Sequence, residues 1–141
     1  MSPTPPPVHR PEFRSLATVA VIVRDYDEAA AWYRKKLNFI LIEDVDLGGG
    51  KRWVVVAASA RSGARLLLAR AADERQEARV GDQTGGRVGF FLETDDFRRD
   101  HERMTARGVE FREEPREEAY GTVAVFADLY GNLFDLIQPR G

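Results

Sequence analysis

The chain of 141 residues contains no cysteine, and histidine and methionine occur only twice each. Without cysteine it cannot form disulfides, use a thiol nucleophile or bind zinc through thiolates. Cysteine-free chains are also compatible with the reducing cytoplasm, where disulfides are rare. The composition therefore excludes thiol chemistry, and we expect a cytoplasmic protein.

Long hydrophobic runs and an excess of positive charge are missing as well. No apolar run approaches the length needed to span a bilayer, and the N-terminus lacks the hydrophobic core of a signal peptide. The formal net charge is −2, whereas a nucleic-acid-binding protein would favour a basic face. We therefore expect neither a membrane nor a nucleic acid as partner.

What remains is the composition of an ordinary globular protein, 43% hydrophobic and 31% charged, in a chain long enough to bury one core. Five of the seven prolines fall in residues 1–14, without any hydrophobic period. This segment is predicted to be a flexible N-terminal arm, followed by a single domain over residues 15–138.

The first half of that domain reads as a strand, a helix and three further strands. The strands are predicted at residues 17–23, 39–42, 52–57 and 65–68. Asp25 or Asp27 can cap the start of the helix, and Asn38 can end it because Asn tolerates the left-handed conformation.

The second half repeats this order, with strands predicted at residues 87–92, 109–111, 123–127 and 133–137. Asp95 or Asp96 can cap a second helix, which runs through Met104 and ends at Gly108. Asp95 follows Asp25 by 70 positions, and Gly108 follows Asn38 by the same interval. The pattern predicts an α+β fold of two tandem βαβββ repeats, at residues 15–70 and 87–138. The linker, residues 71–86, should hold a short helix over residues 72–80. We expect two curved mixed sheets around a cleft, with the helices outside.

Four segments carry a resemblance to a known family: Val21–Asp25, Ala31–Phe39, Ala106–Phe111 and Phe126–Leu136. Through them the chain resembles the vicinal oxygen chelate superfamily of glyoxalases, bleomycin-resistance proteins and extradiol dioxygenases. The resemblance covers residues 15–138, and Glu113–Gly121 is similar to an uncharacterised glyoxalase-like subgroup. It implies a homodimer, since members of this superfamily usually complete their clefts across two chains.

The resemblance also implies where a divalent metal would be held, on the first and last strands of each repeat. These positions are occupied by Thr18, Leu67, Arg87 and Asp135. Leucine cannot ligate a metal, and a guanidinium repels a cation. Neither histidine fills the gap, because His9 lies in the arm and His101 in a charged helix. We therefore predict that no metal and no other cofactor is bound.

Asp135 lies in the middle of the last predicted strand, among apolar residues, where an unpaired buried carboxylate would be costly. Arg65 and Arg87 are on strands expected to line the same cleft, so an Asp135–Arg87 pair is predicted, with a lowered Asp135 pKa. The pair could replace a lost metal structurally or could bind a polar ligand. An arginine fork would suit a carboxylate or a phosphate.

Two aromatic residues, Trp53 and Tyr120, lie near turns that should border the cleft mouth. They could stack on a flat ligand, although packing in the core or over an edge strand is the alternative for Trp53. The predicted ligand-binding cleft thus contains Trp53, Arg65, Arg87, Tyr120 and Asp135. The acidic run Glu113–Glu118 is expected to be a solvated loop.

Three functions fit these observations. The first is a metal-independent small-molecule-binding protein of the bleomycin-resistance type, which the loss of the metal positions favours. The second is a divalent-metal-dependent lyase, isomerase or dioxygenase of the glyoxalase type. The third is a metal-free enzyme that uses Asp135 or Tyr120 as acid or base. Whether the chain is an enzyme stays open at this point, and the sequence does not name a ligand.

Overall fold

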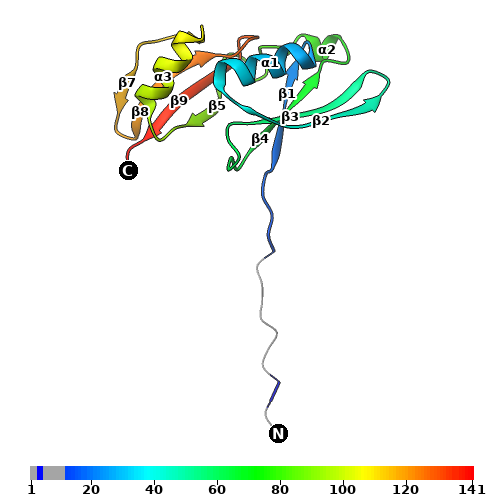
Figure 1. The fold of residues 1–141 in the computed structure, drawn as a ribbon, viewed down its shortest axis with the longest axis horizontal. Helices are drawn as coiled ribbons and strands as arrows, with labels where there is room; N and C mark the ends of the chain where they lie inside the picture. The colour runs from blue at the N-terminus through cyan, green and yellow to red at the C-terminus, as the bar shows by residue number, and fades with distance from the viewer. Residues whose placement is uncertain (1–2, 5–11) are drawn as a thin grey trace.

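The computed structural model describes residues 3–4 and 12–141, so the arm predicted over residues 1–14 lies for the most part outside the described residues. Each half of the chain forms its own mixed sheet, and the two sheets lie side by side in Figure 1. In the described part of the chain, no helix is long and apolar enough to cross a membrane.

The first module has the predicted order of one strand, one helix and three strands. Its elements are β1 (Thr18–Val23), α1 (Tyr26–Leu37), β2 (Ile40–Gly48), β3 (Lys51–Ala57) and β4 (Arg65–Arg70). The sheet order is β1-β4-β3-β2, with β1 parallel to β4 and the other pairs antiparallel. The hairpin of β2 and β3 is longer than predicted and projects from the domain (Figure 1).

The second module repeats this arrangement after a short linker helix, α2 (Glu74–Glu77). Its elements are β5 (Val88–Glu93), α3 (Phe97–Ala106), β6 (Glu110–Phe111), β7 (Arg116–Glu118), β8 (Gly121–Ala127) and β9 (Leu133–Pro139). The order is β5-β9-β8-β6, with β5 parallel to β9, and β7 also pairs with β8. The duplicated α+β architecture predicted from the sequence is confirmed.

The caps that start both long helices are the predicted aspartates. The Asp25 carboxylate accepts a hydrogen bond from the Glu28 amide at 2.8 Å, and Asp96 accepts one from Arg99 at 3.0 Å. After α1, Asn38 takes the left-handed conformation at φ 58°, as predicted. These local signals fix where α1 and α3 begin, and Asn38 fixes where α1 ends.

One core joins the two modules, because side chains from both sheets pack against the same helix, α1. Tyr33 of α1 is fully buried, and its ring lies 5.5 Å from Phe39 and 6.2 Å from Phe134, measured between centroids. Its hydroxyl donates a 2.6 Å hydrogen bond to Asp128, which follows β8. Burial, and secondarily the Asp128 charge, raises the pKa of Tyr33 well above its ordinary value, so this phenol stays a donor.

The linker is bonded to the first strand of the first module through the side chain of a glutamine. The Gln83 side chain accepts a hydrogen bond from the Ile22 amide at 2.8 Å and donates one to the Ala20 carbonyl at 2.7 Å. These are the groups that β1 would offer to a neighbouring strand, so Gln83 protects an exposed sheet edge.

Each sheet turns one face to the core, and strand alternation places the intervening side chains on the opposite face. We call these opposite faces the far faces. The far face of the first sheet carries Trp53, Val55 and Leu67, and that of the second sheet carries Phe91, Val125 and Asp135. The far faces are where the predicted cleft residues must be sought.

Candidate functional site

Asp135 sits at the centre of the far face of the second sheet. On β9 it pairs directly with Phe91 of β5 on one side and with Val125 of β8 on the other, so the three side chains form a row. The residue is only 8% exposed. Its Oδ1 atom is buried, and within the described residues no donor reaches that atom. A carboxylate buried in this way destabilises the folded chain.

Two charged neighbours and burial together determine the pKa of Asp135. Burial is the main cause that raises the Asp135 pKa, the Arg116 charge opposes the rise, and the Glu113 charge adds to it. Arg116 of β7 lies opposite Val123 in the ladder with β8 and therefore on the same face as Asp135. The site thus contains a cation near the buried carboxylate.

That cation is already engaged by two glutamates. Arg116 Nε donates to both carboxylate oxygens of Glu113 at 3.0 and 3.1 Å, and a terminal nitrogen donates to Glu118 at 2.7 Å. Glu113 is itself anchored by the Val125 amide at 3.1 Å. These bonds raise the Arg116 pKa further, so the guanidinium is permanently charged. We call Glu113, Arg116, Glu118 and Asp135 the Asp135 cluster.

The acidic run Glu113–Glu118, predicted to be a solvated loop, is therefore wrongly assigned. Part of it is the strand β7, and Glu113 reaches back into the sheet. The one feature of the sequence that hints at this cluster is Arg116, which has Glu113 before it and Glu118 after it, both close enough along the chain to bond to it. A three-residue polar strand has no hydrophobic alternation, so periodicity could not detect it.

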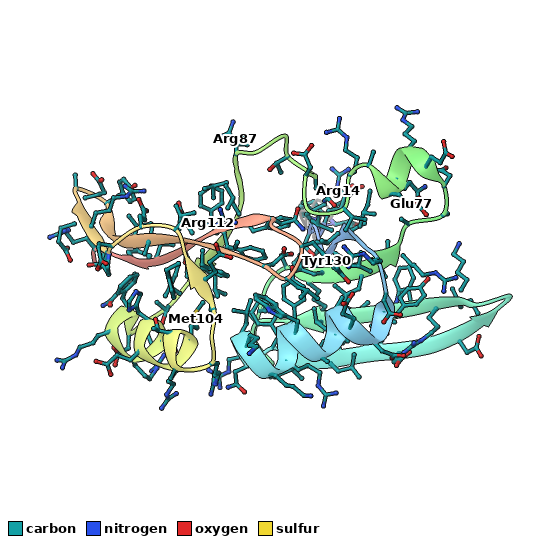
Figure 2. All side chains as sticks on the ribbon, turned by 90° about the horizontal axis from the view of Figure 1, so that it is seen from above. Arg14, Glu77, Arg87, Met104, Arg112 and Tyr130 are labelled. Carbon is teal, nitrogen blue, oxygen red and sulfur yellow. The ribbon has the colours of Figure 1, made fainter. Side chains whose placement is uncertain are left out.

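The predicted pair of Asp135 with Arg87 does not form. Arg87 is exposed in the segment before β5, and Figure 2 shows its side chain extending away from the domain. It is Arg116, not Arg87, whose charge acts on Asp135. The expectation that Arg87 would lower the Asp135 pKa is therefore wrong, and burial raises that pKa instead.

The other predicted site residues lie apart from one another in a single chain. Trp53 on β3 is 40% exposed, and its indole nitrogen donates to Glu43 at 2.6 Å. Tyr120 is 53% exposed in the turn between β7 and β8. Arg65 is exposed at the start of β4 and lines a cavity between the modules. In one chain, Trp53 and Arg65 therefore belong to the first sheet, whereas Tyr120 borders the second.

That cavity has a volume of about 550 Å³, within the range of small-molecule pockets. Its apolar walls come largely from the core side of both sheets. They include Phe39, Val56, Leu66, Phe90 and Phe134. A neighbouring cavity of about 460 Å³ is bordered by polar side chains of α3, among them Arg99 and Asp100. Neither cavity is lined by Asp135.

The residues present do not fit a divalent metal. Of the four positions implied by the resemblance, only Asp135 offers a carboxylate and Thr18 offers no more than a neutral hydroxyl, while nearby Glu113 is held by Arg116 and by a backbone amide. Over residues 3–4 and 12–141 there is no group of three histidine, cysteine, aspartate or glutamate side chains arranged to hold a metal ion. The Asp135 carboxylate can accept a hydrogen bond and can attract a positive charge.

Comparison with known sequences agrees with this architecture. A profile of the glyoxalase/bleomycin resistance protein/dioxygenase superfamily matches residues 15–136. An uncharacterised protein of Shewanella frigidimarina (strain NCIMB 400) is 52% identical over 126 residues, which cover 89% of this chain and 93% of that protein. The uncharacterised protein YurT of Bacillus subtilis (strain 168) is 31% identical over 127 residues, 87% of this chain and 98% of YurT.

Solved structures share the fold over nearly the whole chain. UcmS2 superposes with a TM-score of 0.78 at 30% identity, covering 89% of this chain and 98% of its own. TnmS3, an antibiotic binding protein from Streptomyces sp. CB03234, superposes with a TM-score of 0.72 at 28% identity, covering 94% and 100%. The protein described here belongs to the glyoxalase/bleomycin resistance protein/dioxygenase superfamily.

Proposed function

We propose that this protein binds a small organic molecule on the far face of the second sheet, without a metal and without turning it over. The observation that carries this proposal is the buried, unpartnered Oδ1 of Asp135. A ligand that donates a hydrogen bond would satisfy this acceptor and would offset the cost of burying it.

Similarity supports the same class of function. TnmS3, which shares the fold at 28% identity, is an antibiotic binding protein. Proteins on one fold host many functions, so the residues of this chain must support the function proposed for it. A carboxylate that accepts hydrogen bonds, with the exposed side chain of Phe91 beside it, could bind and orient a small ligand.

We propose further that the site is completed in a homodimer. Apolar side chains are exposed on both sheets: Val45, Leu47 and Trp53 on the first, and Phe91 on the second, with exposed fractions of 40–63%. In a dimer, the first sheet of one copy could face the second sheet of the other. This arrangement would cover these side chains and would bring Trp53 of one copy toward Asp135 of the other. Such an arrangement would restore the predicted cleft that one chain does not close.

The cytoplasmic location remains a prediction, which rests on the absence of cysteine.

The metal-free part of the proposal is tested by thermal unfolding. The melting temperature is measured with a chelator and then with manganese, iron(II), nickel, cobalt and zinc added separately. A metal at about 100 times its dissociation constant stabilises by roughly 2.7 kcal/mol. The proposal expects no metal-specific rise. A rise with one metal that Asp135→Asn abolishes would instead support a metal-dependent lyase, isomerase or dioxygenase.

A further inference from the structure

We propose that the ligand of the Asp135 cluster is an organic cation, a protonated amine or guanidinium attached to a flat apolar body. The inference rests on the proposed function and adds the chemical class of the ligand. It follows from which charged groups face the site, which of them are engaged, and which side chains stand beside them.

The charge of the cluster is negative. Glu113, Glu118 and Asp135 contribute three carboxylates, and Arg116 contributes one guanidinium that bonds to the two glutamates. No donor among the described residues reaches Asp135 Oδ1. An anionic ligand would therefore meet net repulsion, and it would find the guanidinium already engaged.

Hydrogen bonding points to the same class of ligand. An ionised carboxylate only accepts hydrogen bonds, so the partner of Asp135 must be a donor. A neutral hydroxyl would satisfy the acceptor but would add no positive charge to that of Arg116, which Glu113 and Glu118 already engage. A protonated amine supplies both the donor and the opposite charge, and such bonds are about twice as strong as neutral ones.

The neighbours of Asp135 indicate what accompanies the charge. Phe91, the residue paired with Asp135 on β5, is 63% exposed, and Val125 flanks the carboxylate on the other side. Tyr120 is also largely exposed, two residues after Glu118. An exposed ring beside a carboxylate can stack on a flat group and attract a cation through its π face. The site thus offers an apolar platform next to a negative charge.

The ligand charge proposed here is opposite to the one expected from the sequence. Arg65 and Arg87 were the basis for an anionic ligand, but both are exposed and neither contributes to the shift in the Asp135 pKa. The arginine that does face Asp135 is bonded to Glu113 and Glu118.

The test uses three probes that share a naphthalene ring and differ in charge: 2-naphthylmethylamine, 2-naphthylmethanol and 2-naphthoate. Each is titrated calorimetrically into the full chain at neutral pH and low salt, with chelator present. We expect the amine to bind at least tenfold more tightly than the alcohol, and the carboxylate to bind most weakly. Asp135→Asn should bring the amine and the alcohol within threefold of each other.

Glu102→Gln is the matched control. Glu102 is an exposed carboxylate on α3 that pairs with Arg98, so the change removes one negative charge without touching the cluster. It should leave the order of the probes and the amine affinity unchanged. Circular dichroism of both variants checks that each is folded.

The outcomes separate the inference from the proposed function. If the alcohol or the carboxylate binds best and Asp135→Asn changes that binding, the site is real and the cation inference is wrong. If no probe binds, or if Asp135→Asn leaves all three affinities unchanged, the proposed site fails together with the inference.

Discussion

The hydroxyl of Tyr33 donates a hydrogen bond of 2.6 Å to the carboxylate of Asp128, across 95 positions of sequence. Tyr33 belongs to the helix of the first module, and Asp128 begins the turn between the last two strands of the second. Asp128 also accepts bonds from the amides of Tyr130 and Asn132. This buried carboxylate therefore fixes one module against the other.

Tyr33→Phe should lower the free energy of unfolding by about 1–3 kcal/mol, because it removes a buried charge-assisted hydrogen bond without removing the ring. Chemical denaturation measures the loss. Tyr130→Phe is the control, because its hydroxyl bonds to Glu28 at an exposed position and should contribute less than about 1 kcal/mol. Equal losses in the two variants would contradict a special role for the bond between Tyr33 and Asp128.

Gly81→Ala tests the contact between the linker and the turn that follows β8. Gly81 has a φ of 77°, and an added Cβ would collide with the Tyr130 carbonyl. We expect a loss of roughly 3 kcal/mol, from left-handed strain and from the clash. Gly85→Ala has a similar φ of 70° but open space around it, so it should lose only about 1 kcal/mol. Similar melting temperatures for the two variants would mean that the linker does not pack on this turn.

The pH dependence of stability should reveal the cost of Asp135. Its pKa is raised in the folded chain, chiefly by burial, so the folded state binds more protons than the unfolded state between the two pKa values. The free energy of unfolding therefore falls as pH rises through that window and stays lower above it.

Asp135→Asn removes this dependence. At a pH above the pKa of Asp135 in the folded chain, the variant should be more stable than the original chain by about 1 kcal/mol. At a pH below its pKa in the unfolded chain, this difference in stability should vanish. Denaturation curves at several pH values measure the difference, with Glu102→Gln as control. A variant that is less stable at neutral pH would show that Asp135 has a stabilising partner.

The proposed homodimer predicts a mass in solution of about twice 15.9 kDa by light scattering. Phe91→Ser, which removes an exposed apolar side chain from the far face, should shift the chain toward the monomer. A protein that is monomeric at all concentrations would refute the shared cleft.

The sequence was sufficient to predict the fold because its signals are local and occur twice. Asp25, Asp96 and Asn38 cap helices through their own backbone neighbours. A duplication with one constant interval left few alternative architectures.

The site was only partly predictable, because its contacts are not local. The sequence placed Asp135 in an apolar strand, which is β9 in the structure, but it could not show that Arg116 of β7 lies on the same face or that Arg87 points away. Strand pairing decides both, and a short polar strand such as β7 carries no periodic signal.

A metal-free ligand site at Asp135 can be tested in one experiment, the titration of the protein with 2-naphthylmethylamine in the presence of chelator. We expect saturable binding that is unchanged when chelator is replaced by divalent metals, and that is lost or strongly weakened in Asp135→Asn. Binding that requires an added metal, or that survives the loss of the Asp135 carboxylate undiminished, would contradict it.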